Sequence, residues 1–353
     1  MSDQPHEQLF ALSSSRDFDS WLAASGSSIA FTTYQAGKLF MVGTQADGHL
    51  SVVERTFPRS MGLAVSSDGR TVALATQYQI HRFDNVLGAG QSTPDGVDAV
   101  YAPHAGWVTG DVDAHDVGFD ADDRPIFVNT KFSCVAAVSD GHSFQPLWKP
   151  GFISRLAAED RCHLNGLAME DGEPRYVTVV ARSDVADGWR ERRSDGGMVI
   201  DVRSGEVVAE GLSMPHSPRL HQGRLWLLNS GLGQFGYVDL KTGRFEPVAF
   251  CPGYARGLAF LGHRAIIGLS LAREDGTFSG LPLDDALRDH GAEARCGLAV
   301  IDPDRGDMVD WVRIEGVVRE LYDVAVLPGV KRPSLIGFKS DDIRFIISID
   351  DAS

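Results

Sequence analysis

The chain has 353 residues, of which 43% are hydrophobic and 23% charged, and its formal net charge is -15 at pH 7. These proportions are typical of a folded globular protein and exclude a largely disordered one. The acidic excess argues against non-specific binding to nucleic acid or to an anionic membrane, because basic patches must neutralise such negative surfaces. We therefore expect no nucleic acid and no membrane among its partners.

No targeting or membrane-spanning segment is recognisable. The N-terminus, MSDQPHEQLF, lacks a basic stretch followed by an apolar run, and no stretch of about eighteen apolar residues occurs. The four cysteines are widely separated and lack C-x-x-C spacing, which predicts neither a zinc knuckle nor a disulfide framework. We expect a cytoplasmic protein with buried thiols.

The predicted elements begin with a short helix, RDFDSWLAAS, inside an N-terminal extension that we assign to residues 1–27. Three candidate strands follow: SIAFTTY, KLFMVGT and LSVVERTF. A second helix, LPLDDALRDHG, has an Asp-rich first turn and is expected within a loop insertion at residues 271–294. Almost all of the remaining pattern is typical of short strands.

From residue 60 onward the sequence contains a repeat. Six segments each combine a short apolar strand, a turn, and a second strand rich in β-branched or aromatic residues. They begin at Ser60, Ala114, Leu164, Pro215, Ala255 and Leu321. Their spacing of about 40 to 66 residues is typical of propeller blades, and turns such as DVRSGE, DLKTGR and DPDRGD predict a hairpin between the third and fourth strands of a blade.

These patterns predict an all-β fold, a single six-bladed β-propeller domain over residues 1–353 with a central channel. The N-terminal strands leave two arrangements open. One of them can close the ring by joining the C-terminal RFIISID segment, or together they can form an extra blade and make the total seven. We favour six blades.

Polar residues stand at the start of every repeated first strand, where apolar or small residues would be ordinary. Because these starts converge at one mouth of the channel, we expect a functional site there. His115, His163 and His216 come from successive blades and could bind one divalent transition metal (zinc, iron, copper or manganese), with positions left for water or substrate. Each histidine could instead form only structural hydrogen bonds.

Charged residues at the same mouth complete the candidate catalytic set. Glu320 or Asp323 could orient a metal ligand or act as a general base. Arg59 and Arg256 suit recognition of a carboxylate or phosphate, since a guanidinium offers paired donors. The alternative for the arginines is an ion-pair ring with Asp113, Glu320 or Asp323. Lys131, at the end of a paired strand, is a candidate substrate-binding residue together with Asn165, Arg219 and Asn229.

Several segments resemble a bacterial family of conserved hypothetical proteins without an assigned function. They are YQAGKLF, HLNGLAM, MPHSPR, LWLLNSGLG and YARGLAF, and the likeness spans nearly the whole chain. The resemblance implies a propeller in which His163, Asn165, His216, Arg219 and Asn229 belong to one site, and it implies no reaction.

The predicted architecture is also similar to gluconolactonase-type hydrolases, streptogramin lyases and carotenoid-cleaving oxygenases, by analogy of fold alone. The lactonase group uses a Glu, Asn and Asp metal set and the oxygenases use four histidines, whereas this mouth offers three histidines.

The leading hypothesis is a metal-dependent enzyme acting on a small anionic metabolite or modified peptide, as a hydrolase, a lyase or isomerase, or an oxygenase. One alternative is a non-catalytic propeller that binds a peptide or partner protein. Another is a metal-free lyase or isomerase with His115 or His216 as general base.

Overall fold

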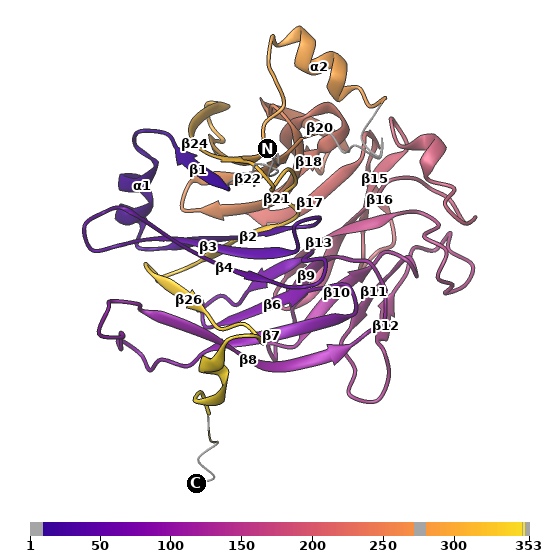
Figure 1. The fold of residues 1–353 in the computed structure, drawn as a ribbon. Coiled ribbons are helices and arrows are strands. Elements are labelled where there is room, and N and C mark those ends of the chain that lie inside the picture. Colours follow the sequence, from indigo (N-terminus) through magenta and orange to yellow (C-terminus); the bar gives the residue numbers. More distant parts are fainter. Residues whose placement is uncertain (1–9, 272–279, 348, 350–353) are drawn as a thin grey trace, which may run out of the picture.

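The computed structural model describes residues 10–271, 280–347 and 349. These residues form six small sheets arranged as the blades of a β-propeller (Figure 1). The innermost strands of neighbouring blades contact one another in a closed ring around the central channel. The structure confirms the predicted all-β class and the count of six blades. The first nine residues of the predicted N-terminal extension, and residues 272–279 of the predicted insertion, lie outside the described residues.

Each blade is a meander that runs from an innermost strand outward. In the first half of the chain the blades are β5 (Leu63–Val65), β6 (Thr71–Ala75), β7 (Gln79–Asn85) and β8 (Ala99–Val108); β9 (Ala114–Phe119), β10 (Pro125–Asn129), β11 (Cys134–Ala137) and β12 (Gln145–Trp148); and β13 (Leu164–Glu170), β14 (Glu173–Val179), β15 (Gly197–Asp201) and β16 (Val207–Leu212). The predicted repeat segments supply the inner hairpins of these blades.

The next two blades follow the same order. They are β17 (Pro215–His221), β18 (Arg224–Asn229), β19 (Gln234–Asp239) and β20 (Arg244–Phe250), then β21 (Tyr254–Leu261), β22 (Arg264–Ser270), β23 (Gly297–Asp302) and β24 (Asp307–Glu315), with β1 (Ala11–Ser14) on the outer edge. The DVRSGE, DLKTGR and DPDRGD turns join third to fourth strands, as predicted.

Strands from both ends of the chain build the last blade. Its inner strand is β25 (Val324–Leu327), which pairs antiparallel with β2 (Ser28–Thr33), and β3 (Lys38–Thr44) and β4 (Leu50–Thr56) continue outward. The three N-terminal strands are therefore neither an extra blade nor a single closing strand. Pairing across nearly the whole chain length closes the ring and removes a free edge from the circle.

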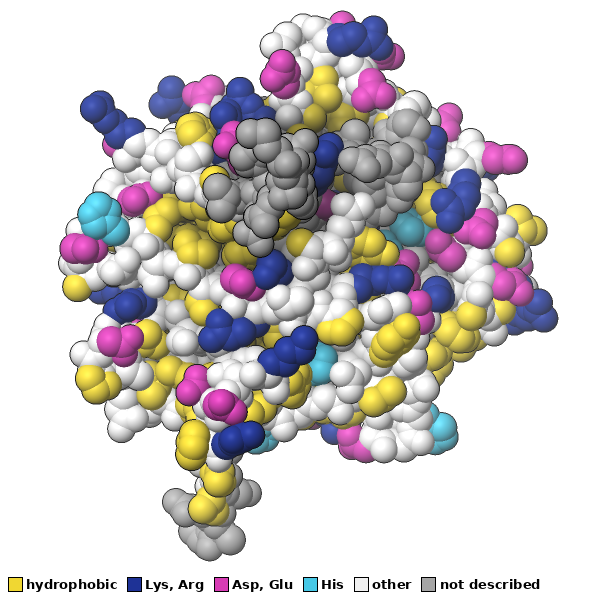
Figure 2. All heavy atoms as spheres, in the orientation of Figure 1, with side chains coloured by type: hydrophobic (Ala, Val, Ile, Leu, Met, Phe, Trp, Pro, Cys, Tyr) yellow, Lys and Arg dark blue, Asp and Glu magenta, His cyan; other side chains and the backbone are white. Residues whose placement is uncertain are grey.

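The expectation that RFIISID forms a ring-closing strand is wrong. The chain after β25 forms β26 (Pro333–Leu335), which adds in parallel to the outer strand β8, and then the 3₁₀ turn η3 (Asp341–Arg344). Because β25 already occupies the inner position, the described residues of RFIISID extend from the body, and Phe345 is 82% exposed. Figure 2 shows apolar side chains along this segment.

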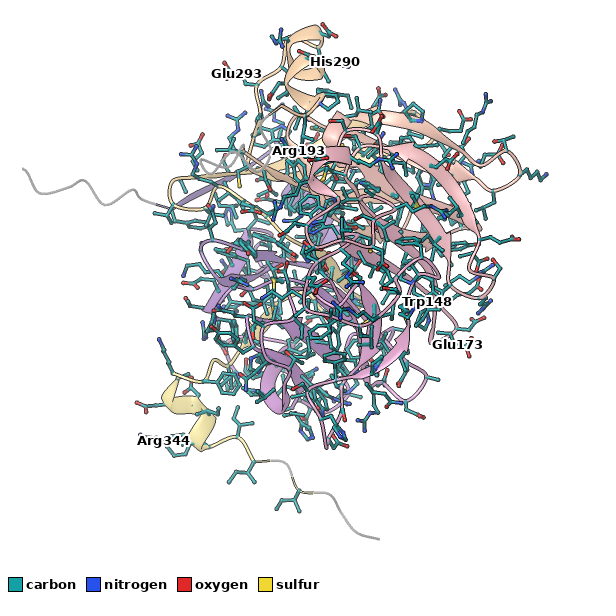
Figure 3. The ribbon with its side chains drawn as sticks, turned by 90° about the vertical axis from the view of Figure 1, so that its right-hand side faces the viewer. Trp148, Glu173, Arg193, His290, Glu293 and Arg344 are labelled. Atoms are coloured by element: carbon teal, nitrogen blue, oxygen red, sulfur yellow. The ribbon has the colours of Figure 1, made fainter. Side chains whose placement is uncertain are left out.

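Both predicted helices are present. Helix α1 (Phe18–Ser25) packs Phe18 and Leu22 onto the last blades, and α2 (Leu283–Asp289) stands in the connection between β22 and β23. Seen from the side (Figure 3), α2 projects from the body, and His290 at its end stacks on Phe250 with 4.0 Å between ring centroids. No described helix has both the length and the apolar character needed to cross a membrane.

The core lies between neighbouring blades, where apolar faces pack against one another. Most inner and second strands are therefore buried on both faces, which explains their continuous apolar runs. The four cysteines are buried, unpaired thiols, and burial raises the pKa of each to about 12, which makes them unreactive.

Candidate functional site

The inner strands begin around a cavity of about 170 Å³ at one end of the channel. We call this end the histidine mouth. Aromatic, histidine and charged side chains line it: Tyr34, Asp113, His115, Asp160, His163, Trp189, Arg190, Met214, Tyr254, Arg256 and Tyr322. They come from strand starts and from the loops between blades, so the ring of blades creates the site.

The backbone at the histidine mouth is strained in a repeated way. Four residues occupy equivalent positions just before the inner strands of successive blades, and each has a positive φ of 46–52°: Arg59, Asp113, His163 and Met214. This left-handed region is costly for side chains other than glycine, by about 1–3 kcal/mol per residue, and such strain collects at functional sites. The turn carries three of these residues into the cavity lining. It is also why His163 reaches the site although it precedes β13.

His163 forms a hydrogen-bonded pair with Asp160. Its Nδ1 lies 2.8 Å from Oδ2 of Asp160, and the indole nitrogen of Trp189 donates to the same oxygen at 2.9 Å. The imidazole also stacks on Trp189, with 4.1 Å between ring centroids. The ring is thus held by one carboxylate and one aromatic face, and its Nε2 has no partner among the described residues.

His115 lies edge-on to His163, with 4.8 Å between ring centroids. Its Nδ1 is 3.0 Å from the carbonyl oxygen of Asp113 and 2.8 Å from Oγ1 of Thr130. Because the Thr130 hydroxyl donates to the Leu164 carbonyl at 2.6 Å, it accepts from His115, which assigns the proton of His115 to Nδ1. Burial, and then the nearby His163 and Arg256, lower the pKa of His115 well below its usual value. It is therefore neutral at pH 7, with Nε2 unprotonated.

His216 lies behind this cavity and does not line it. Its Nδ1 donates to the Met214 carbonyl at 2.8 Å, and the amide of Asn165 donates to its Nε2 at 3.2 Å. Asn165 in turn accepts from the Thr178 hydroxyl at 2.7 Å. Burial followed by the charge of Arg256 lowers the pKa of His216 well below its usual value. Asn165 and His216 thus form a closed network that supports the site.

The three histidines do not form a compact metal-ligand group. Within the part of the chain that the structure describes, a single trio of His, Cys, Asp or Glu brings its ligand atoms within 4.8 Å of one another: His263, Asp302 and Asp304. That trio lies away from the histidine mouth. Nε2 of His263 is 3.5 Å from Oδ1 of Asp302 and 3.3 Å from Oδ2 of Asp304, at the end of β23. It is a possible metal-binding triad, and the sequence analysis did not single it out.

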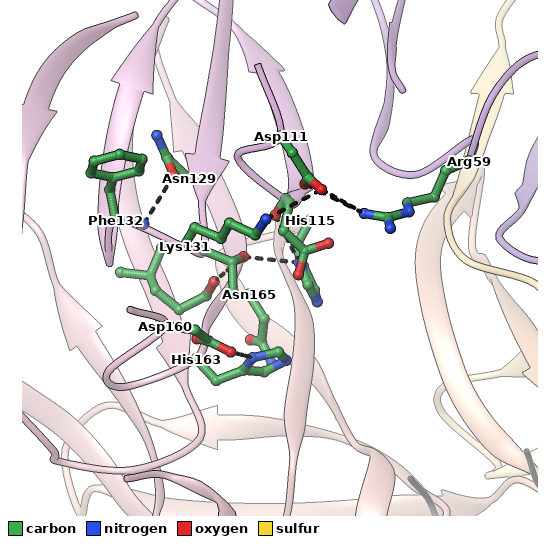
Figure 4. Close-up of polar contacts among 12 residues, drawn as sticks. Arg59, Asp111, His115, Asn129, Lys131, Phe132, Asp160, His163 and Asn165 are labelled. Carbon is green, nitrogen blue, oxygen red and sulfur yellow. Dashed lines mark hydrogen bonds and ion pairs between the residues drawn. The ribbon is translucent and has the colours of Figure 1, made fainter. Parts of the chain in front are cut away.

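The two arginines of the predicted catalytic set, Arg59 and Arg256, both form ion pairs. Arg256 is 5% exposed, bonds Glu320 at 3.3 Å and lies over the ring of Tyr322 at 4.1 Å. Arg59 pairs with Asp111 at 3.4 Å, and Lys131 reaches the other oxygen of Asp111 at 3.2 Å (Figure 4). The predicted ion pair with Glu320 is therefore observed for Arg256, whereas Arg59 pairs with Asp111, an acid that the prediction did not name. Arg256 alone of these cations lines the cavity.

Two other predicted site residues lie deeper in the channel. Arg219 reaches across it to Asp116, at 2.8 Å and 3.1 Å, and to Asp323 at 3.4 Å. Burial, and then the charge of Asp116, raise the pKa of Asp323 to about 7.

Asn229, another predicted site residue, makes structural hydrogen bonds: it accepts from the backbone of Ser213 at 2.8 Å and donates to Gln234 at 3.1 Å. Asn229, like Arg219 and Asp323, does not line the cavity of the histidine mouth.

The same deep carboxylates join neighbouring blades. Asp116 accepts from the backbone nitrogen of Leu167 at 2.9 Å, and Asp323 accepts from that of Leu63 at 2.8 Å. Gly62 packs directly against the backbone of Asp116, where a Cβ on residue 62 would lie only 2.9 Å from the Cα of Asp116. These bonds cross between blades, so Asp116 and Asp323 primarily fix the ring.

Sequence reasoning missed Asp160, Trp189 and Asp116. Asp160 precedes His163 by three residues in the string DRCH, which was a usable local signal. The shared letters of AHDVGF and LYDVAV mark Asp116 and Asp323 as equivalent positions. Trp189 lies in a loop between β14 and β15, and no spacing in the sequence connects it with His163.

The chain is similar to one sequence family and, in its fold, to a solved structure. A family described as a domain of unknown function (DUF4915) matches residues 16–336. No curated protein matches the sequence. A chain from a crystal structure of a nidogen/laminin complex is 11% identical with a TM-score of 0.53, covering 86% of this chain and 99% of that one. The TolB structure from Acinetobacter baumannii is 13% identical, with a TM-score of 0.49 and coverages of 87% and 67%. At such identities the first likeness concerns the fold alone.

Proposed function

Because the chain belongs to the family described as a domain of unknown function (DUF4915), its relatives supply no activity, and we propose from its own site that it is an enzyme acting on a small polar substrate at the histidine mouth. One observation carries the proposal. His115 and His163 stand 4.8 Å apart at the wall of the cavity, and the Nδ1 atom of each is occupied by a protein acceptor. Their Nε2 atoms are thereby left to meet a ligand.

His163 is the proposed general base. The Asp160 carboxylate at 2.8 Å holds the imidazole in one tautomer and stabilises the imidazolium that forms when Nε2 takes a proton. Trp189 fixes the plane of the ring. In the reaction, Nε2 of His163 accepts a proton from the substrate, or from a water that attacks it, and returns that proton in a later step.

His115 and Arg256 are proposed to position the substrate. His115 is neutral, so its Nε2 can accept a hydrogen bond from a substrate hydroxyl or amide. Arg256 uses one amino group on Glu320 at 3.3 Å and can offer other N–H groups to a substrate oxygen. The anionic substrate predicted from the sequence would place its carboxylate or phosphate there.

The size of the cavity favours a small molecule over a peptide. Its volume of about 170 Å³ equals that of roughly six water molecules at about 30 Å³ each. A metabolite of a few carbon and oxygen atoms fits this space. The walls of Tyr34, Tyr254 and Tyr322 surround such a substrate with aromatic surface.

A metabolite extract in D₂O tests this proposal even while the substrate is unidentified. The extract is incubated with the wild-type protein, with His163→Gln, or with His142→Gln, which changes an exposed histidine elsewhere, and is followed by proton NMR. We expect at least one small metabolite to be converted or deuterated by the wild type and by His142→Gln, and about 10²–10⁴-fold more slowly by His163→Gln. Binding of a metabolite without any conversion would support the non-catalytic propeller instead.

A metal-dependent version of the same enzyme is the second candidate. The observation that favours it is the hydrogen-bond pattern: all three predicted histidines engage Nδ1, and His115 and His163 keep Nε2 as a potential ligand atom. His115 and His163 could hold zinc, iron, copper or manganese, and His216 could join them by releasing Asn165. Mass spectrometry of chelator-free protein is the test. Near-stoichiometric metal that disappears when all three histidines are replaced by alanine supports this version, and metal-free wild-type protein with conversion intact contradicts it.

A further inference from the structure

The channel has a second mouth, at the end where the inner strands stop. A cavity of about 610 Å³ opens there, several times larger than that of the histidine mouth. We call it the acidic mouth. It lies below the Arg219 cluster, which separates it from the histidines.

The acidic mouth has a ring of apolar side chains on its inner wall, with polar side chains such as Ser66, Arg219 and His221 among its other lining residues. Every inner strand contributes at least one half-buried apolar side chain to this ring, and the largest from each are Val65, Phe119, Met169, Leu220, Phe260 and Val326. The same inner strands carry polar residues at their other ends, which face the histidine mouth. An open cavity walled in this way leaves apolar surface in contact with water, which a ligand with an apolar body would cover favourably.

The rim of the cavity carries two acidic side chains. Asp123 and Asp171 line it, and their carboxylates form no ion pair or hydrogen bond within the described part of the chain. The two turns that carry them touch, since a Cβ on Gly172 would come within 2.6 Å of the backbone of Ala121. Among the described lining residues the one arginine is Arg219, which Asp116 and Asp323 already engage.

We propose that the acidic mouth binds a small organic cation, an ammonium or guanidinium group carried on an apolar stem. The stem lies against the ring of six apolar side chains, and the charged group meets Asp123 and Asp171 at the rim. The net charge of -15 favours approach of a cation over that of an anion of the same shape. This site is separate from the proposed catalytic one and does not depend on it.

Two methionines allow the mouths to be observed separately. Met169 lines the acidic mouth and Met214 lines the cavity of the histidine mouth. The full-length protein, labelled at methionine methyl groups, is titrated with hexylammonium and, in parallel, with hexanoate, which has the same stem and the opposite charge. We expect hexylammonium to shift the Met169 signal in a saturable way and to leave Met214 unshifted, with hexanoate binding at least tenfold more weakly.

Variants of the rim complete the test. Asp123→Asn combined with Asp171→Asn should weaken hexylammonium binding by about tenfold. Asp122→Asn is the matched control, because Asp122 is an exposed acid in the same turn as Asp123 and does not line the cavity. The affinity of this variant for hexylammonium should stay within about twofold of that of the wild type. The proposal is overturned if hexanoate shifts Met169 with equal affinity, if the double variant binds hexylammonium as the wild type does, or if no saturable shift of Met169 occurs.

Discussion

Replacing Arg219 with methionine should destabilise the ring more than any surface substitution. The guanidinium lies inside the channel and bonds two buried carboxylates, those of Asp116 at 2.8 Å and 3.1 Å and that of Asp323 at 3.4 Å. Removing one partner of a buried ion pair costs about 3–5 kcal/mol, because the remaining charge is left buried without compensation. Here two carboxylates are left, so we expect a loss in this range at pH 8.

The loss should shrink at lower pH. Without Arg219, protonation is the remaining way to neutralise Asp323, whose pKa burial already raises, so the folded variant binds a proton that the unfolded chain releases above a pKa of about 4. The free energy of unfolding of the variant therefore falls more steeply than that of the wild type as pH rises from 5 to 8. Urea unfolding followed by tryptophan fluorescence at both pH values measures this difference.

The control is Arg244→Met, which removes an exposed arginine 3.7 Å from Glu246 and should change stability by less than about 0.5 kcal/mol. The reasoning is refuted if Arg219→Met lies within about 1 kcal/mol of the wild type at pH 8, or if its destabilisation is the same at pH 5 and pH 8.

Two further substitutions test the inter-blade contacts. The pKa of Asp323 in the folded protein is raised to about 7, so this group contributes stability at low pH that is lost as pH rises from about 4 to 7. Urea unfolding of Asp323→Asn and of the wild type across this range should show that the variant lacks the decline. Parallel pH profiles of the two proteins would contradict the assignment. Gly62→Ala should cost about 1–3 kcal/mol in thermal unfolding, since its Cβ would lie 2.9 Å from Asp116, whereas Gly141→Ala, which meets nothing within 4 Å, should be neutral; equal effects would argue against close packing at Gly62.

The candidate site was predicted in part. The sequence placed His115 and His163 at one mouth because both stand at the start of a repeated strand, and the structure brings them to one cavity. It also grouped Arg219 and Asp323 with them, whereas these two meet in the channel interior. Alternation along a strand indicates which face a residue occupies, but depth in the channel depends on how all six strands tilt together.

The sequence by itself determined the blades. In five of the six blades the inner hairpin is a local feature, formed by an apolar strand, a short turn and a second strand within about twenty contiguous residues. The sixth predicted segment, from Leu321, is the exception, because β25 pairs with β2 and β26 adds to β8. The turns between third and fourth strands and both helices are local in the same sense. These were the elements that sequence reasoning predicted correctly.

Only the tertiary structure decided how the ring closes and which polar groups meet. β2 pairs with β25 across some 300 residues, and the described residues of RFIISID, a segment with an equally strand-like pattern, stay outside the blades. Arg219 likewise finds Asp116 and Asp323 at separations of 103 and 104 residues. Such contacts depend on the radius and twist of the closed ring, a property of all blades together that no single stretch of sequence encodes.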